Sequence, residues 1–333
     1  MNASPRVLVD CGTVPFEQLE PRRWHFFLLH YDTQPNGSPL TFPICMMRGD
    51  EPGPRVTIVS GVHGDEFEGV RALWHLLDRP DFRIDRGMLV LVPIAHPAAY
   101  NAGTRTSPMD GLNLARVFPG VEHGTTTERL AFVLFHQVVR ASTLLIDFHS
   151  GGTRYLHAPL AGFYDLPDAA GAQSLALAQA TGWKYLWAAP FRAGVLSYEC
   201  ARYGIPSLGT EVGGAGRCLP EDVALYAPTL RRIAHYAGMV TEEAHESGVS
   251  EQVIIDGDWL LAPQAGFLEP IVELDQHVAA GQVLGHVLDQ FGCRVTEIRA
   301  QEGGIIVGIR AYPPILAGEW GVFVGRVRKK ETK

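Results

Sequence analysis

Cysteine is scarce in this 333-residue sequence, and its distribution argues against a disulfide-stabilised protein. The five cysteines are scattered, odd in number and include no C-x-x-C pair. Secreted domains that depend on disulfides contain paired cysteines, whereas intracellular thiols stay reduced. We therefore expect reduced cysteines with structural roles, and a cytoplasmic protein.

Long apolar runs and an excess of basic residues are also missing. No apolar stretch approaches ~20 residues, the length that a membrane-spanning helix needs. The first residues, MNASPRVLVDCG, lack the basic start and the long apolar run of a signal peptide. The formal net charge of −8 argues against a nucleic-acid partner, which requires a basic stripe. The hydrophobic content of 46% is ordinary for a soluble enzyme with a large core.

What the sequence does contain is a regular alternation of strand and helix patterns between about residue 55 and residue 240. Apolar, β-branched runs predict buried strands, and the segments between them have the apolar spacing of helices. This pattern favours an α/β fold with a mixed, mostly parallel sheet and helices on both faces. The predicted strands are 55–62, 88–94, 144–148 and 206–212, and the predicted helices are 70–77, 127–140, 168–181, 194–203 and 219–240.

Segments rich in β structure flank this α/β region on both sides. Asn36 and Gly37 lie between two apolar runs and predict a hairpin near the N-terminus. Beyond about residue 245 the segments are short, β-rich and punctuated by Gly and Pro, and two parts of this region echo each other. The expected domains are 1–248, which includes the N-terminal β segment 1–50, and a small all-β domain over 249–333.

Side chains that can bind a metal follow two of the predicted strands. His63 and Glu66 come directly after strand 55–62, and His149 ends the strand that carries Asp147. Because ligands bind at the carboxyl ends of strands in an open α/β sheet, we expect these side chains to converge there. Two histidines and one glutamate hold zinc with one position open for water, and Asp147 is a candidate to support one of these ligands. The alternative is a loop histidine at 149 and a capping aspartate at 147.

Three further residues are candidates for chemistry at the same edge. Glu211 precedes two glycines near the end of the strand 206–212, where a general base for a bound water is required. Arg105 and Arg116 lie in a loop over 97–127 that is too long for a simple connection. Arginine binds carboxylates and stabilises a developing oxyanion. On spacing alone, Glu211 is also compatible with a surface carboxylate, and the arginines are compatible with solvated loop residues.

Taken together, these motifs resemble the succinylglutamate desuccinylase and aspartoacylase family, a branch of the zinc carboxypeptidase fold. The resemblance rests on His63-x-x-Glu66, on D-F-H-S around His149, on the R-V-F-P-G stretch and on Glu211 before two glycines. It covers roughly residues 50–240. The C-terminal β region also resembles the barrel-sandwich-like domain that the family carries.

The resemblance implies hydrolysis of the amide bond of a small N-acyl amino acid. It implies that His63, Glu66 and His149 hold one Zn²⁺ per chain. Glu211 would be the general base, and Arg105 would polarise the scissile carbonyl group. Arg116 would bind the substrate carboxylate, with Asn113 as a candidate helper. The sequence departs from the family in one place, because Ala115 stands where the family usually has an asparagine before the second arginine.

Two other functions stay open at this point. One is a metallocarboxypeptidase that acts on short peptides, and the other is a non-catalytic zinc-binding protein. The acyl group, the amino acid and the oligomeric state are not defined by these patterns, although a homo-oligomer is compatible with them. We expect Trp183 and Trp187 to be core residues. Histidines without a comparable context are expected to be structural or surface residues: His75, His136, His157, His235, His277 and His286.

Overall fold

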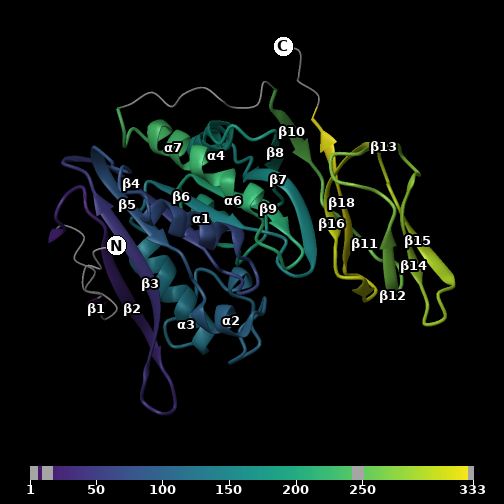
Figure 1. The fold of residues 1–333 in the computed structure, drawn as a ribbon, viewed down its shortest axis with the longest axis horizontal. Coiled ribbons are helices and arrows are strands. Elements are labelled where there is room, and N and C mark those ends of the chain that lie inside the picture. Colours follow the sequence, from purple (N-terminus) through teal and green to yellow (C-terminus); the bar gives the residue numbers. More distant parts are fainter. Residues whose placement is uncertain (1–6, 10–17, 242–250, 329–333) are drawn as a thin grey trace.

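The structure is a computed structural model of the chain that describes residues 7–9, 18–241 and 251–328. Its centre is one large mixed sheet that runs through most of the molecule (Figure 1). The sheet has the strand order β1-β2-β3-β5-β4-β6-β9-β7-β8-β10-β18-β16-β13, and β11 pairs with β18. Its strands are β1 Val7–Val9, β2 His25–Thr33, β3 Pro39–Arg48, β4 Glu51–Ser60, β5 Arg86–Val92, β6 Leu144–His149, β7 Tyr155–Phe163, β8 Tyr185–Ala188, β9 Ser207–Gly214, β10 Val253–Asp256, β11 Trp259–Leu261, β13 His277–Val278, β16 Gly304–Arg310 and β18 Trp320–Val327.

Helices cover both faces of the central strands, as the sequence predicts. The helical segments are α1 Glu68–Leu77, α2 Pro97–Ala102, α3 Thr126–Val133, α4 Ala169–Ala180, α5 Leu196–Arg202, α6 Pro220–Ala224 and α7 Tyr226–Tyr236, with a 3₁₀ turn over Leu114–Arg116 and a π-helical turn over Leu134–Val139. None of the helices in the described ranges is long and apolar enough to cross a membrane.

The alternation of side chains along the central strands divides the core into two layers. In β5, Leu89 and Leu91 pack in the layer that contains α1, α4, α6 and α7. Val90 and Val92 point to the opposite layer, which contains α3, the π-helical turn and α5. In Figure 1, α4 and α7 lie towards the top of the view and α2 and α3 towards the bottom. Because successive strand residues point to opposite faces, one apolar run supplies both layers.

The four central strands are parallel, and this directs their carboxyl ends to one edge. β4 pairs in parallel with β5 and β6, and β6 pairs in parallel with β9. Pairs outside this centre are mixed: β2 and β3 form the antiparallel hairpin that Asn36 and Gly37 predict, and β7 runs antiparallel to β9. The sheet is therefore mixed, with its parallel part where the candidate side chains lie.

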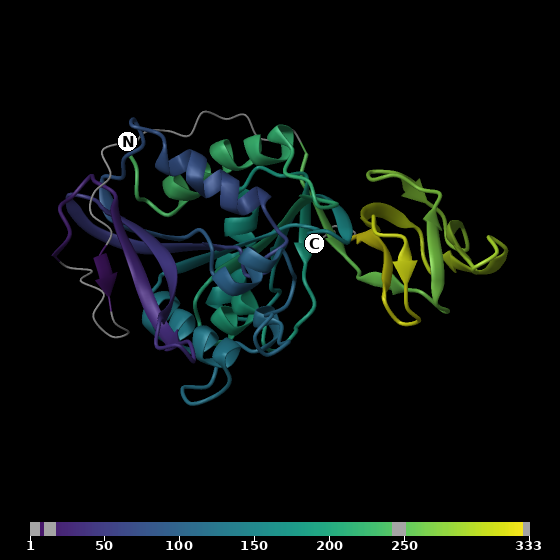
Figure 2. The same ribbon diagram turned by 60° about the horizontal axis from the view of Figure 1, so that its bottom comes forward.

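The C-terminal part of the chain is rich in strands, as expected. A second sheet with the order β15-β14-β12-β17 faces β16 and β18, and the two form a sandwich that lies to one side in Figure 2. The predicted domain boundary at 248 lies outside the described residues. Beyond it, β10 pairs with β8 and β16 pairs with β7, so the large sheet continues into the C-terminal region. The strands of the second sheet are β12 Gly266–Pro270, β14 Val283–Leu288, β15 Arg294–Arg299 and β17 Pro314–Ile315.

Two predicted segments differ from the structure in detail. The helix predicted over 219–240 is divided into α6 and α7 at Leu225. Pro228 has no backbone N–H and cannot donate to the carbonyl group four residues earlier, which explains the division. The long loop over 97–127 contains α2 and the 3₁₀ turn, so it is more ordered than its composition suggests.

Candidate metal centre and active site

The turns after β4 and β6 bring the predicted ligands to one point. His63 and Glu66 lie in the turn between β4 and α1, and His149 is the last residue of β6. Gly61 has a φ of +64°, a conformation that glycine adopts without strain. An added Cβ at Gly64 would lie 2.0 Å from the carbonyl carbon of Ala99, so only glycine lets this turn approach α2 so closely.

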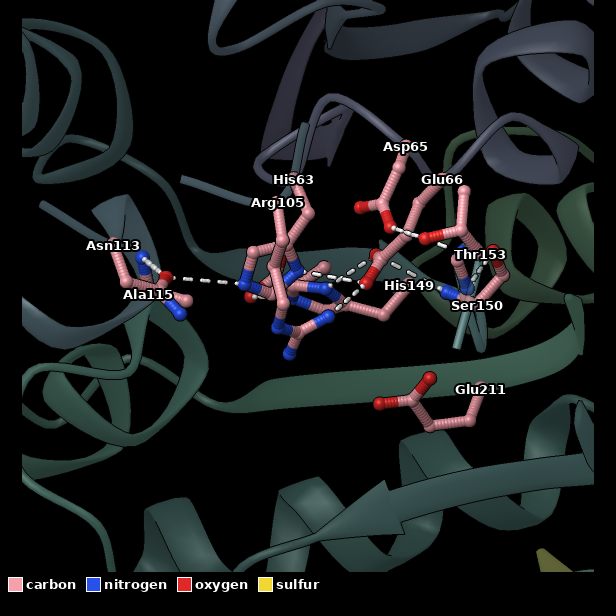
Figure 3. Close-up of polar contacts among 12 residues, drawn as sticks. His63, Asp65, Glu66, Arg105, Asn113, Ala115, His149, Ser150, Thr153 and Glu211 are labelled. Carbon is pink, nitrogen blue, oxygen red and sulfur yellow. Dashed lines mark hydrogen bonds and ion pairs between the residues drawn. The ribbon is translucent and has the colours of Figure 1, made fainter. Parts of the chain in front are cut away.

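The geometry of these side chains fits a bound cation. Nδ1 of His63 lies 2.7 Å from Oε1 of Glu66, and Nδ1 of His149 lies 2.9 Å from Oε2 of the same carboxylate. One ligand atom from each of the three residues lies within 4.8 Å of the others. Figure 3 shows the three side chains directed toward one another. A set of two imidazoles and one carboxylate is the donor set of a catalytic zinc site with an open position.

Residues around this group direct the Nδ1 atoms toward its centre. His63 Nε2 lies 3.1 Å from Asn113 Oδ1, and His149 Nε2 lies 3.1 Å from Asp147 Oδ2. The Asn113 oxygen also accepts a hydrogen bond from the backbone N–H of Ala115, so it acts as an acceptor toward His63. When Nε2 of a neutral imidazole donates, Nδ1 carries the lone pair. A lone pair 2.7 Å from a carboxylate oxygen is unfavourable unless a proton or a cation lies there, and this supports the fit to a metal ion.

In the metal-free chain, a proton of His149 lies between its Nδ1 and Oε2 of Glu66. Burial alone would raise the pKa of Glu66, but His63 and His149 hold it well below its usual range. Burial alone would lower the pKa of His149, but Asp147 and Glu66 raise it well above its usual range. Burial, aided by Arg105, lowers the pKa of His63 to about 4. The group therefore combines an ionised carboxylate with one charged and one neutral imidazole, and a metal ion would replace the proton between His149 and Glu66.

Glu211 lies beside this group, and its carboxylate has few polar partners among the described residues. Its Cα is paired with that of His149 in the β6–β9 ladder. Its Oε2 atom is buried and has no hydrogen-bond partner among the described residues, and Figure 3 shows the side chain across from Glu66 without a dashed line. Burial raises the pKa of Glu211 to about 8. A carboxylate with a raised pKa next to an open metal position can accept a proton near neutral pH.

The predicted arginines reach the same cavity by different routes. Arg105 donates from Nη1 to Oε1 of Glu66 at 2.9 Å. Arg116 donates to the backbone carbonyl group of Ala115, and no carboxylate within the described ranges forms an ion pair with it. Burial, with repulsion from Arg105 and Arg192, lowers the pKa of Arg116. Arg116 is thus an exposed cation at the cavity wall that is suited to an incoming anion. Asn113 does not line the cavity. Its side-chain oxygen instead contacts His63 and caps the 3₁₀ turn.

A cavity of about 110 Å³ opens onto the group. That volume holds on the order of ten water molecules, which suits a small substrate better than a peptide. The predicted residues that line it are His63, Arg105, Arg116, His149 and Glu211. Residues without a predicted role at the site also line it, among them Tyr155, Arg192, Asp258, Trp259, Trp320 and His157, which the sequence predicts to be structural or on the surface.

These additional residues had only weak signals in the sequence. Tyr155 and His157 are two positions apart on β7, which places them on one face of a strand. Trp259 and Trp320 lie far from the other candidates in sequence, and only the folded chain brings them to the cavity. Trp187 lines the cavity as well, so its expected role as a core residue is incomplete, whereas Trp183 is buried in the core.

Comparison with known proteins gives a consistent match. The model of the succinylglutamate desuccinylase/aspartoacylase catalytic domain matches residues 52–237. An N-α-acetyl-L-2,4-diaminobutyric acid deacetylase of Halomonas elongata is 32% identical over 280 residues, which cover 81% of this chain and 81% of that protein.

Solved structures agree with this match over nearly the whole chain. The product-bound ectoine utilization protein EutE (DoeB) of Ruegeria pomeroyi has a TM-score of 0.85 and 27% identity, and covers 94% of this chain and 98% of that one. A succinylglutamate desuccinylase of Silicibacter sp. TM1040 has a TM-score of 0.83 and 25% identity, with coverage of 95% and 98%. A succinylglutamate desuccinylase/aspartoacylase of Rhodobacter sphaeroides, at 24% identity and a TM-score of 0.83, shows the same fold with coverage of 95% and 98%.

Proposed function

This chain belongs to the succinylglutamate desuccinylase/aspartoacylase family, and from that premise we propose that it is a zinc-dependent hydrolase of a small N-acyl amino acid. The observation that carries the proposal is the buried set of His63, Glu66 and His149, which opens onto a small cavity next to Glu211. In this proposal residues 1–248 form a zinc carboxypeptidase-like catalytic unit. Residues 249–333 form an all-β unit that contributes to the cavity wall.

His63, Glu66 and His149 would hold the zinc ion. A zinc ion bound there would lower the pKa of a water molecule and polarise the carbonyl group of the substrate. The outer hydrogen bond to Asn113 and the ion-pair contact with Asp147 keep both Nδ1 atoms directed inward. Such support typically changes metal affinity or activity by about 10–100-fold.

The other residues of the cavity would carry out the hydrolysis. Glu211 takes a proton from the attacking water and passes it to the leaving amine, because its carboxylate is the base adjacent to the open side of the group. Arg105 lies beside Glu66 and stabilises the negative charge that develops on the carbonyl oxygen. Arg116 has no carboxylate partner among the described residues and binds the substrate carboxylate.

The relatives direct the choice of first substrates. Since the relative in Halomonas elongata is a deacetylase of N-α-acetyl-L-2,4-diaminobutyric acid, we propose an N-acetylated amino acid as the substrate class to test first. Ala115 has no side-chain amide to accompany Arg116 in binding a carboxylate. A hydrogen bond to a charged group contributes roughly 1.5–3 kcal/mol, so this position changes specificity rather than abolishing binding.

A hydrolysis screen of the zinc-loaded protein tests the proposal. The panel pairs acetyl, succinyl and formyl groups with acidic, basic and neutral amino acids and includes short peptides. We expect turnover of at least one N-acyl amino acid that is lost on chelation and restored by zinc. Glu211→Gln should retain zinc and lose about 10²–10⁴-fold in kcat.

Other outcomes would replace the proposal. Turnover of peptides alone would favour a metallocarboxypeptidase. Near-wild-type turnover by Glu211→Gln would exclude Glu211 as the base. Absence of turnover across the panel with stoichiometric zinc bound would favour a zinc-binding protein without hydrolase activity on these substrates.

A further inference from the structure

One polar contact at the cavity has no role in the reaction described above. Oε2 of Glu211 is buried without a hydrogen-bond partner, and Nε2 of His157 lies 3.8 Å from it. Nδ1 of His157 is also buried and without a hydrogen-bond partner in the described part of the chain. A buried polar atom without a partner is costly, so two such residues facing each other need an explanation.

The local backbone directs His157 toward Glu211. β7 runs antiparallel to β9, with His157 opposite Gly213 and Leu160 opposite Glu211, and the register shifts between these two pairs. Pro159 lies within this shift and cannot donate to the ladder, so the irregularity falls where the chain has no N–H to offer. The register is still regular at His157, so His157 points to the same face of β7 as Tyr155, and both residues line the cavity.

The C-terminal β region holds the ring of His157 in place. The ring of Trp259 contacts it edge to face, with centroids 5.3 Å apart and an interplanar angle of 87°. The backbone of His157 is paired with Gly308 of β16. A Cβ at Gly308 would lie 3.0 Å from Cη2 of Trp259, so glycine leaves the space that the indole occupies. His157 is therefore fixed from the side of the C-terminal β region while it faces Glu211.

We propose that His157 is a positioning residue for Glu211. In this role its Nε2–H donates to Oε2 of Glu211 once the two atoms, which are 3.8 Å apart in this structure, come within hydrogen-bond distance, and the other carboxylate oxygen stays available to accept a proton. Trp259 keeps the imidazole in this orientation, so the C-terminal β region sets the geometry of the base. The role in hydrolysis rests on the proposed function, whereas the contact itself does not.

Kinetics of matched variants test the role. His157→Phe keeps a ring of similar shape without the N–H, and we expect kcat to fall by about 10²-fold with little change in KM, because misplacement of a reacting group by about 1 Å has effects of that size. The pH profile of kcat/KM should shift as well. His157→Gln restores a donor and should recover most of the activity. His286→Phe is the control, because His286 is also buried and lies 3.6 Å from a glutamate, Glu297, away from the cavity.

Two kinetic outcomes would overturn the proposal. If His157→Phe raised KM and left kcat unchanged, His157 would contact the substrate instead of the base. If His157→Phe and His286→Phe lost the same small activity, with no shift of the pH profile, the residue would be structural only. Zinc content is measured for every variant, so that loss of the metal is not mistaken for loss of positioning.

Imidazole ¹⁵N NMR of the metal-free protein tests the contact without any substrate. We expect Glu211→Gln to shift the ring resonances of His157, which are assigned by their disappearance in His157→Gln. Glu297→Gln should shift only those of His286. Unchanged His157 resonances in Glu211→Gln would overturn the proposal even in an active enzyme. If the wild-type chain hydrolyses nothing while the His157 resonances shift, the proposed function fails and the contact stands.

Discussion

At the scale of single residues, the two histidines of the proposed zinc site are supported by acceptors of different charge. Asp147 offers a carboxylate to His149, whereas Asn113 offers only a neutral amide oxygen to His63. Both acceptors stand behind the ligands and fix the direction of Nδ1. The neutral support is the weaker one, because hydrogen bonds with an ionised partner are roughly twice as strong.

Asn113→Ala should therefore lower zinc affinity. Loss of this acceptor frees the His63 ring and removes the cap of the 3₁₀ turn, so we expect affinity to fall by about 10–100-fold. Competition with a chromogenic chelator measures the change. Asn101→Ala, at an exposed position of α2, is the control and should leave affinity unaltered. Equal affinity of Asn113→Ala and the wild type would show that Asn113 does not orient His63.

Glu211 should make the stability of the metal-free protein depend on pH. Its pKa is raised by burial from 4.5 to about 8, so between these values the folded chain binds a proton that the unfolded chain releases. The free energy of unfolding that Glu211 contributes therefore falls as pH rises from about 4.5 to about 8. Because Gln does not titrate, Glu211→Gln should gain stability relative to the wild type over this window.

Thermal unfolding of the two metal-free proteins at pH 5.5 and pH 8 measures this difference. The melting temperature of Glu211→Gln minus that of the wild type should be larger at the higher pH. Glu273→Gln, at an exposed position of the C-terminal region, should show no such trend. A difference that is constant with pH would mean that Glu211 is already ionised at the lower pH.

At the scale of secondary structure, the position of the ligands depends on how closely α1 approaches the sheet. A Cβ at Gly69 would lie 2.6 Å from Oγ of Ser60 and 2.7 Å from Cβ of Phe148. The helix begins just after Glu66, so any outward shift of α1 displaces this ligand from His149. Glycine at 69 is therefore part of the site although it contacts no ligand.

Gly69→Ala should destabilise the fold and weaken zinc binding together. Overpacking of a core typically costs about 1–3 kcal/mol, which exceeds the gain of roughly 1 kcal/mol from replacing a helical glycine by alanine. Chemical denaturation and the chelator competition measure the two effects. Gly209→Ala is the matched control, because its Cβ would meet only Ser197 Oγ at 3.5 Å. Unchanged stability in Gly69→Ala would show that α1 adapts without cost.

The sequence predicts those elements whose patterns are local. The parallel strands β4, β5, β6 and β9 are continuous apolar runs, so their existence and the convergence of His63 and His149 at their ends follow from the pattern. Strand β7 is interrupted by Pro159 and Gly162, residues that are rare inside strands, so the pattern does not predict it. Consequently the sequence predicts only a structural or surface role for His157, which lies on this strand and lines the cavity.

At the scale of the whole molecule, the cavity is shared between sequence regions that no local pattern connects. The sequence predicts an all-β C-terminal region, but not that β16 would pair with β7 and bring Trp259 and Trp320 to the cavity. Such pairings depend on register and on long-range packing. The indole rings of these two residues are stacked with centroids 5.5 Å apart, and Arg192 lies over the Trp320 ring while it pairs with Asp258.

The part of the cavity wall that Trp259 and Trp320 form should limit the size of the substrate. Trp320→Ala removes one of the two stacked rings and the surface on which the Arg192 guanidinium rests, and so widens the cavity from the side of the C-terminal region. We expect the ratio of kcat/KM for a long-chain acyl substrate to that for the acetyl substrate to rise about tenfold or more, because one methylene in an apolar pocket changes discrimination by roughly 10–200-fold. Phe291→Ala is the control, since Phe291 is 81% exposed in the same region and does not line the cavity. An unchanged ratio in Trp320→Ala, with zinc retained, would mean that the acyl group does not extend toward the C-terminal region and that the catalytic unit alone sets substrate size.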